Sequence, residues 1–172
     1  MWEGLCDFMR KGVYAGSFDP PTLGHMWIID RGIRMFDELV LAVGVNPDKR
    51  SLFTIDERLE MLREITKGHR NIKVDSYENQ FLVNYAKSIN ANYILRGIRS
   101  YKDYEYENGI RKINEDIDKE VTTVFLMPPE EVCGISSSLV KGLIGPEGWE
   151  KVVQKYVPRY VYRKLLDKNP GA

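Results

Sequence analysis

The chain has 172 residues, of which 43% are hydrophobic and 29% charged, a composition typical of a globular protein with a well-formed core. Its 25 basic and 25 acidic residues cancel, so no overall basic field favours nucleic acid as a partner. No apolar run approaches the ~20 residues that a membrane-spanning helix needs, so the sequence does not predict a membrane protein.

Short apolar runs alternate with amphipathic segments, which is the pattern of a parallel sheet covered by helices. Residues 1–10 are expected to form an N-terminal extension; it contains Glu3 and Asp7 and lacks the apolar core of a signal peptide, so a cytoplasmic location is expected. The expected strands are 12–15, 39–45, 72–75, 93–95 and 122–126, and the expected helices are 24–35, 55–66, 82–89, 104–117, 137–143, 147–155 and 158–166.

This order of elements predicts one α/β domain over residues 11–166, followed by a flexible tail at 167–172. The expected fold is a Rossmann-like, doubly wound sheet of five parallel strands with helices on both faces and a helical C-terminus. The run 39–43 is continuously apolar, as expected for a strand that is buried on both faces.

The cysteine and histidine content argues against a resident metal. Cys6 and Cys133 lie far apart and match no metal-ligand spacing, so both are expected to be reduced thiols. The chain has only two histidines, and no cysteine–histidine cluster is present. His69 lies in a polar loop, and we assign it no role.

The first expected strand ends in the motif Gly-Ser-Phe-Asp-Pro at 16–20, which is closed by Gly24 and His25. A glycine turn between a strand and a helix lets the backbone approach a ligand, and the N–H groups at the helix start can seat a phosphate. The Ser17 hydroxyl and the His25 imidazole belong to the same region. A rigid Asp-Pro turn without a binding role is the alternative.

Polar segments follow four of the five expected strands. Ser17 follows the first strand, residues 46–49 follow the second, 96–99 the fourth and 128–138 the fifth. In open α/β sheets ligands bind beyond the carboxyl ends of the strands. The sequence therefore predicts that these segments meet in one site.

Taken together, the motifs resemble those of the phosphopantetheine adenylyltransferase family of HxGH-type nucleotidyltransferases. The resemblance covers roughly residues 11–145 in order. It rests on Gly-Ser-Phe-Asp-Pro (16–20), Gly-His (24–25), Asn-Pro-Asp-Lys (46–49), Leu-Phe-Thr-Ile-Asp-Glu-Arg (52–58), Arg-Gly-Ile-Arg (96–99), Asp-Tyr-Glu-Tyr-Glu (103–107), Val-Phe-Leu-Met-Pro (124–128) and Ile-Ser-Ser-Ser-Leu-Val (135–140).

The resemblance implies transfer of AMP from ATP to 4′-phosphopantetheine, giving dephospho-coenzyme A and pyrophosphate in coenzyme A synthesis. The acceptor's phosphate is the nucleophile, and Mg²⁺ arrives with ATP. Dephospho-coenzyme A or coenzyme A is expected to bind as well. The family commonly forms a hexamer, so a homo-oligomer is expected.

Four residues match the positions that carry the family's chemistry. His25 is expected to stabilise the α-phosphate in the transition state, because an imidazole N–H can donate to the oxygen that gains charge. Ser17 is expected to contact both the acceptor phosphate and ATP. Lys49 and Arg96 resemble the residues that hold the acceptor phosphate against the nucleotide.

The resemblance also implies larger contact sets. Glu107 could instead be an acidic residue of an ordinary first helical turn, and Leu82 could be plain core. The expected acceptor contacts are Ser17, Lys49, Leu82 and Arg96. The expected ATP contacts are Ser17, Phe18, His25, Gly97, Ile98, Arg99, Glu107, Val132, Cys133, Gly134, Ile135, Ser136, Ser137 and Ser138.

Three segments depart from the family pattern. Val132-Cys133-Gly134 stands where family members carry an aromatic residue, and Asn114-Glu115 replaces an Asn-Arg pair. The third is the tail with Gly145-Pro146-Glu147-Gly148-Trp149 and Tyr156, Tyr160 and Tyr162, which is either a subunit contact or ordinary hydrophobic packing of the last helices. Two other functions stay open: a related nucleotidyltransferase for another acceptor (nicotinamide mononucleotide, or glycerol 3-phosphate with CTP), and a non-catalytic sensor of nucleotide or coenzyme A.

Overall fold

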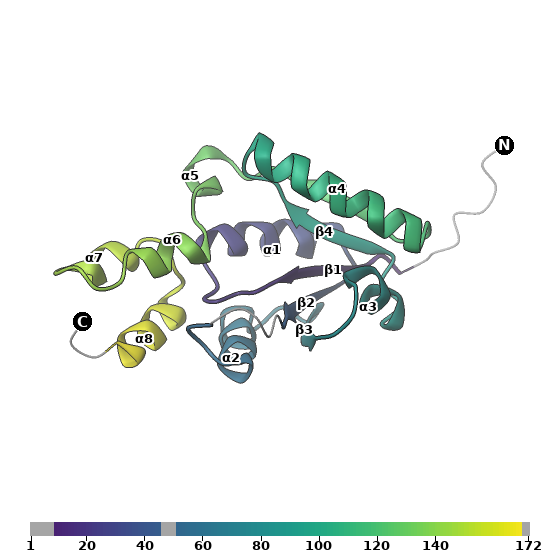
Figure 1. Cartoon of the computed structure of the whole chain (residues 1–172). Coiled ribbons are helices and arrows are strands. Elements are labelled where there is room, and N and C mark those ends of the chain that lie inside the picture. The colour runs from purple at the N-terminus through teal and green to yellow at the C-terminus, as the bar shows by residue number, and fades with distance from the viewer. Residues whose placement is uncertain (1–8, 46–50, 170–172) are drawn as a thin grey trace.

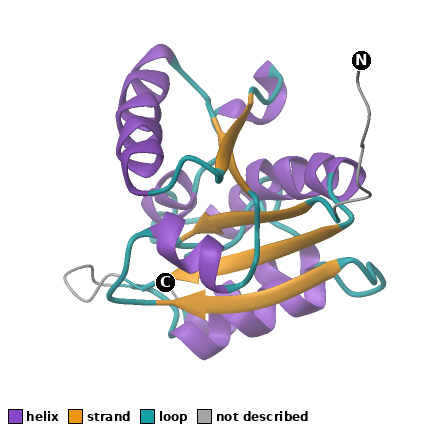
Figure 2. Ribbon diagram, turned by 90° about the vertical axis from the view of Figure 1, so that its right-hand side faces the viewer, coloured by secondary structure: helices purple, strands orange, loops and turns teal. Residues whose placement is uncertain are grey.

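A computed structural model describes residues 9–45 and 51–169 of the chain. Five parallel strands form one sheet in the order β3-β2-β1-β4-β5, with helices on both faces (Figures 1 and 2). This confirms the predicted fold class. The strands are β1 (Lys11–Gly16), β2 (Glu38–Gly44), β3 (Ile72–Tyr77), β4 (Tyr93–Gly97) and β5 (Thr122–Leu126).

The helices lie between and after the strands in chain order. The early ones are α1 (Leu23–Met35), α2 (Ile55–Ile65), α3 (Leu82–Ser88) and α4 (Tyr101–Ile117). The C-terminal part adds α5 (Glu130–Cys133), α6 (Ser137–Gly142), α7 (Trp149–Val153) and α8 (Arg159–Lys168).

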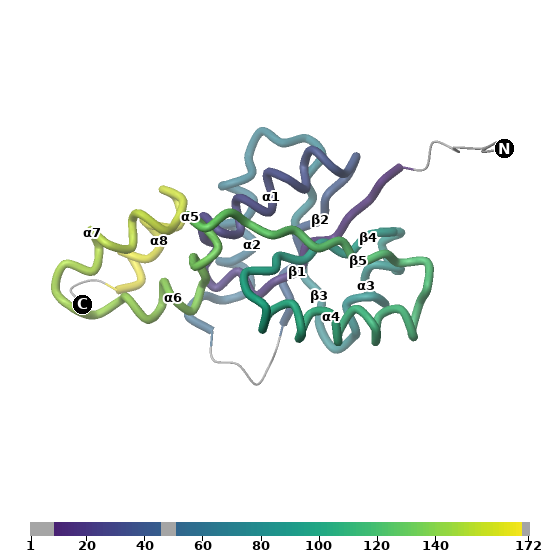
Figure 3. Tube along the Cα trace, turned by 90° about the horizontal axis from the view of Figure 1, so that it is seen from above, coloured from purple at the N-terminus to yellow at the C-terminus, as the bar shows by residue number. Residues whose placement is uncertain are grey.

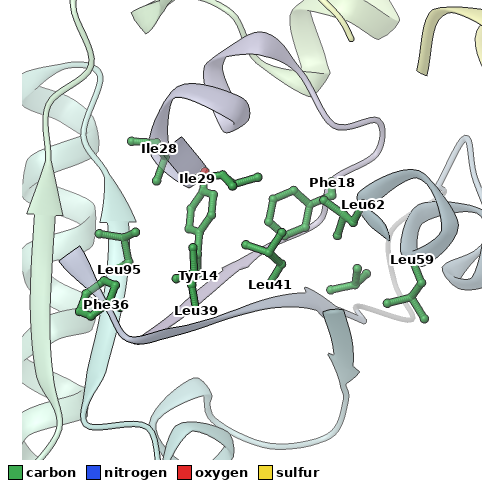
Figure 4. Close-up of a cluster of buried hydrophobic side chains, with 11 residues drawn as sticks. Tyr14, Phe18, Ile28, Ile29, Phe36, Leu39, Leu41, Leu59, Leu62 and Leu95 are labelled. Carbon is green, nitrogen blue, oxygen red and sulfur yellow. The ribbon is translucent and has the colours of Figure 1, made fainter. Parts of the chain in front are cut away.

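Alternate residues of the central strands face two separate hydrophobic clusters. Tyr14, Leu41 and Leu95 pack with α1 and α2 on one face (Figure 4). On the other face, Val13 and Ile94 pack with α3. The period-two alternation of side chains along a strand produces this division, and it explains the continuous apolar run in β2.

A third cluster holds the C-terminal helices together. Residues of α6, α7 and α8, among them Trp149 and Leu165, pack with Phe53 and Met61 of the α2 region. Figures 1 and 3 show these helices gathered at one end of the molecule, beside α2. The C-terminal segment thus supports the region just downstream of residues 46–50.

The boundaries of every predicted element lie within three residues of the expected ones, and the shifted starts of α4 and α7 have a local cause. Helix α4 begins at Tyr101 because the Ser100 side chain caps it by accepting from the Asp103 N–H. Helix α7 begins only at Trp149, since Gly148 adopts a left-handed φ of 79°. The four-residue α5 was not predicted, because it is too short to show a hydrophobic period.

Both ends of the described chain are held to the domain. At the start, Arg10 donates to Asp37 from its backbone N–H and from its guanidinium. At the other end, α8 runs to Lys168, two residues into the expected tail. Across the described residues, none of the helices has the length and apolar content that crossing a membrane requires.

Candidate active site

Three of the four predicted segments, Ser17, 96–99 and 128–138, meet at the carboxyl ends of β1 and β4, while 46–49 lies outside the described residues. The strand order reverses between these two strands, and such switch points are where open α/β sheets bind ligands. A cavity of about 440 Å³ lies there. It is lined by Tyr14, Ala15, Gly16, Ser17, Gly24, His25, Ile28, Arg96, Gly97, Arg99, Asp103, Tyr106, Glu107, Pro128, Val132, Ile135, Ser136, Ser137 and Ser138.

The His25 ring is fixed by the start of helix α1. Thr22 is the N-cap, and its side chain accepts from the His25 N–H while its own backbone N–H donates to His25 Nδ1 over 3.0 Å. Because Nδ1 accepts a backbone N–H, the neutral ring carries its proton on Nε2. The capping geometry therefore leaves one N–H donor on a ring that lines the cavity.

Desolvation by burial, together with the smaller effect of the positive charge of Arg99, lowers the pKa of His25 to about 4. The ring is therefore neutral at physiological pH and acts as a donor without being a cation. The unfolded chain takes up this proton near pH 6.5, so the contribution of His25 to stability falls as the pH drops from about 6.5 to 4.

We expect the His25 ring to titrate with a midpoint near pH 4 in the ligand-free protein. The measurement is a pH series of the histidine ring resonances by NMR, with a His69→Asn variant to assign the two signals. A His25 midpoint at or above 6.5 would contradict the buried, neutral ring.

The segment before α6 is tied to the loop after β1. Ser137 Oγ donates to the Pro20 carbonyl over 2.8 Å, and Thr22 Oγ1 donates to the Ile135 carbonyl over 3.2 Å. Lys141 on α6 forms an ion pair with the buried Asp19 at 2.8 Å. These three contacts bring residues more than 100 positions apart into one wall of the cavity.

Gly24 allows this close approach. A Cβ at this position would lie inside contact distance of the Ile135 carbonyl oxygen and 3.2 Å from that of Val132. Both obstacles are backbone atoms, which cannot move aside as a flexible side chain could.

Replacing Gly24 with alanine should displace residues 132–138 and lower the affinity for ATP at least about 10-fold, since an overpacked contact of this kind costs about 1–3 kcal/mol. Isothermal titration with ATP measures the effect. Gly134→Ala is the matched control, because a Cβ there meets open space; equal affinities in the two variants would refute the close-approach argument.

The guanidinium of Arg96 is fixed by hydrogen bonds to Glu107 and to the Ala15 carbonyl. Its Nε donates to Glu107 Oε2 over 2.8 Å, its Nη2 donates to Glu107 Oε1, and its Nη1 donates to the Ala15 carbonyl over 2.8 Å. Burial would lower the pKa of Arg96, but the hydrogen bond and charge of Glu107 outweigh it and raise the pKa. Two of the five guanidinium N–H groups remain for a ligand.

The ion pair with Arg96 gives Glu107 a role that the sequence did not predict. The sequence suggested a nucleotide contact, whereas the carboxylate is 8% exposed and makes a bidentate ion pair with Arg96. Glu107 still lines the cavity, so its direct contact with ATP stays a prediction. In the structure, the Glu107 carboxylate orients the guanidinium of Arg96.

Arg99 also lines the cavity, and its ion pair with Asp103 is more exposed than the Arg96–Glu107 pair. Its Nε donates to Asp103 Oδ2 over 2.8 Å, and its backbone N–H donates to the same oxygen. Its two terminal nitrogens make no hydrogen bond with the described residues. They can therefore reach an anion in the cavity.

The structure does not bring every expected residue to the cavity. The side chains of Phe18 and Ile98 are buried in the protein, at 0% and 3% exposure, so any contact of these two with ATP would have to come from the backbone. Cys133 and Gly134 lie beside the cavity wall but do not line it. Lys49 lies outside the described residues.

Two further cavities adjoin the main one at Arg96, which lines all three. A cavity of about 460 Å³ at the ends of β1, β2 and β3 is also lined by Ser17, Tyr77 and Gln80. A smaller one of about 160 Å³ lies between the sheet and helices α3 and α4, and the expected acceptor residue Leu82 lines it. Ser17 and Arg96 are thus shared between the first and the 460 Å³ cavity.

Sequence reasoning missed two residues that organise the site. Thr22 fixes the His25 tautomer, and its position three residues before His25 is the capping spacing that could have revealed it. Asp19 accepts from the backbone N–H groups of Leu52 and Phe53 and from Lys141, which anchors the chain just after residues 46–50. Nothing in the sequence pairs Asp19 with these distant partners.

Comparison with known proteins agrees with this architecture. The model of the cytidylyltransferase-like family matches residues 13–143. A phosphopantetheine adenylyltransferase of Chromobacterium violaceum is 58% identical over 92% of this chain and 96% of its own length. One from Neisseria meningitidis serogroup C is 57% identical over 93% of this chain and 94% of its own.

More distant proteins share the fold. A phosphopantetheine adenylyltransferase of Caldanaerobacter subterraneus is 43% identical over 93% of this chain and 98% of its own length. The solved structure of Plasmodium falciparum nicotinic acid mononucleotide adenylyltransferase with NaAD superposes with a TM-score of 0.68 at 18% identity, covering 93% of this chain and 96% of that one. The resemblance seen in the motifs is confirmed: the chain belongs to the cytidylyltransferase-like family and, within it, to the phosphopantetheine adenylyltransferases.

Proposed function

We propose that the protein transfers AMP from ATP to 4′-phosphopantetheine, giving dephospho-coenzyme A and pyrophosphate in the cytoplasm. The observation that carries this is the joint placement of Ser17 and Arg96. Both line the 440 Å³ cavity with His25, and both line the adjoining 460 Å³ cavity. A nucleotide in the first and an acceptor in the second would meet at these two side chains.

The first cavity suits the nucleotide. Ser136, Ser137 and Ser138 line it at the start of α6, and hydroxyls with free N–H groups at such a position can bind the β- and γ-phosphates. The guanidinium of Arg99 adds positive charge on the rim. Mg²⁺ would arrive bound to the ATP phosphates; the described residues offer no cluster of three or more metal-binding side chains.

The acceptor would place its phosphate near Ser17 and the two remaining N–H groups of Arg96. Lys49 is proposed to hold the same phosphate by the resemblance alone. The uncharged arm of the acceptor would extend into the 160 Å³ cavity lined by Leu82. This assigns each of the three cavities to one part of the two substrates.

The chemistry needs no covalent enzyme intermediate. A phosphate monoester is largely dianionic at neutral pH, so its oxygen can attack the α-phosphorus without a general base. The new P–O bond forms as the bond to the β-phosphate breaks, and pyrophosphate leaves in line. His25 Nε2–H donates to an α-phosphate oxygen as charge builds there, which stabilises the transition state.

An acceptor panel tests the proposal directly. We expect pyrophosphate release with ATP and 4′-phosphopantetheine, and none with nicotinamide mononucleotide or with glycerol 3-phosphate and CTP. Turnover of another pair alone would assign a related transferase. Binding of ATP and coenzyme A without turnover of any pair would assign a sensor.

We propose that the protein assembles as a homohexamer, as the family resemblance implies. Exposed apolar and aromatic side chains on α4 and just before α3, among them Tyr101, Ile113, Ile117 and Phe81, are a candidate contact surface. Light scattering of the full chain gives the mass. A mass of one chain, 19.9 kDa, at micromolar concentration would refute it.

A further inference from the structure

The 160 Å³ cavity is lined by both apolar and polar side chains. Leu82, Ile94 and Ile110 supply the apolar side chains. Arg111 and Asn114 of α4 and Thr123 of β5 supply the polar ones. A cavity that only enclosed a hydrocarbon would not need these polar side chains. We therefore expect its ligand to carry polar atoms that match them.

Thr123 has an unsatisfied hydroxyl. Its Oγ1 is one of two buried side-chain polar atoms that have no hydrogen-bond partner in residues 9–45 and 51–169. A buried hydroxyl without a partner is unfavourable and rare in folded proteins. A rotation of about 120° about the Cα–Cβ bond moves Oγ1 to another staggered position, and Thr123 lines the cavity, so the hydroxyl can turn toward a ligand there without backbone movement.

Arg111 offers further donors at the same cavity. Its Nε donates to Asn108 Oδ1 over 3.1 Å, and its Nη1 donates to Glu115, one turn further along α4. Its Nη2 makes no hydrogen bond within the described part of the chain. The Glu115 carboxylate, which departs from the family pattern, is therefore the partner that balances the charge of Arg111.

The charges around the cavity cancel in pairs. Arg96 is paired with Glu107, and Arg111 with Glu115. No net field therefore favours a charged ligand group. A neutral group that both accepts and donates hydrogen bonds satisfies a hydroxyl and a guanidinium together, and an amide is the simplest such group.

We propose that Thr123 and Arg111 determine acceptor specificity by binding one amide group of the acceptor's arm. This rests on the proposed function, in which 4′-phosphopantetheine carries two amides between its phosphate and its thiol. Arg96 lines both this cavity and the 460 Å³ cavity in which the acceptor is proposed to bind. The arm can therefore extend into the 160 Å³ cavity while the phosphate stays at the reaction centre.

The first test compares two neighbouring threonines of β5. Thr123→Val should lower kcat/KM for 4′-phosphopantetheine about 5-fold through the acceptor KM, with the KM for ATP unchanged, because one neutral hydrogen bond is lost. Thr122→Val is the matched control, since Thr122 is exposed and does not line the cavity. Arg111→Met should lower kcat/KM about 10-fold, with the exposed Lys112→Met as its control.

The second test changes the acceptor. Two analogues are made in which one amide or the other is replaced by two methylene groups. With the analogue that lacks the recognised amide as acceptor, Thr123→Val and the unsubstituted protein should have equal kcat/KM. With the other analogue, kcat/KM of Thr123→Val should remain lower than that of the unsubstituted protein. A merely structural role of Thr123 would lower both equally.

The outcomes distinguish a failure of this inference from a failure of the proposed function. If the unsubstituted protein does not turn over 4′-phosphopantetheine with ATP, the proposed function is wrong and the inference fails with it. If it turns over the acceptor but Thr123→Val and Arg111→Met match their controls, the function stands and the inference is overturned. A difference that persists with both analogues overturns it too.

Discussion

Replacing His25 with alanine should lower turnover by a factor of about 100 or more while ATP binding remains largely intact. The imidazole is the donor whose hydrogen bond strengthens as charge builds on the α-phosphate, and removal of one preorganised donor typically costs 10²–10³ in kcat. Steady-state pyrophosphate release gives kcat, and calorimetry gives the affinity for ATP.

Two further variants separate the donor from the helix cap. His25→Asn keeps an acceptor near the Nδ1 position that Thr22 uses and has no donor at Nε2, so it should be as slow as alanine. His25→Gln places an amide N–H near the Nε2 position and should recover part of the rate. Unchanged turnover in the alanine variant would remove His25 from the mechanism.

Replacing Arg96 with alanine should lower the free energy of unfolding by about 3–5 kcal/mol, because Glu107 would be left as an unpaired, mostly buried carboxylate. The loss is a large part of the stability of a typical domain. Activity should fall as well, because the guanidinium lines all three cavities. Urea denaturation measures the change in stability.

The matched control is Arg99→Ala, which breaks an exposed pair with Asp103 and should cost less than about 1 kcal/mol. If Arg96→Ala does not fold, the double variant Arg96→Met/Glu107→Gln decides. It leaves no buried charge and should regain much of the lost stability. Equal stability of the two single variants would show that the Arg96–Glu107 pair does not hold the site together.

The fold could be predicted because each strand and long helix carries its own signal. The apolar run of β2 and the helical periods of α1 and α2 are local patterns, and the parallel order follows from their alternation. Among the described elements only α5 was missed, because its four residues are too few to show a hydrophobic period. The late start of α7 depends on one left-handed glycine.

The site was predicted as a set of segments more securely than as a set of contacts. Ser17, His25 and the serines at 136–138 do line one cavity, since all follow the carboxyl ends of strands of the same parallel sheet. Phe18 does not, because its side chain turns into the core between β1 and α1 (Figure 4). A motif shows which residues are near a ligand, but which way each side chain points depends on the packing around it.

The sequence by itself determined the fold class, the family and the neighbourhood of the reaction, because these rest on local patterns and motif order. Only the tertiary structure decided how the groups act. Glu107 and the Ala15 carbonyl together accept three of the five N–H groups of Arg96, Gly24 admits the Ile135 carbonyl, and Lys141 pairs with Asp19. These pairings join residues that are distant in the chain, and no spacing in a linear sequence encodes them; the Thr22 cap of His25 is the exception, because its three-residue spacing is a local signal.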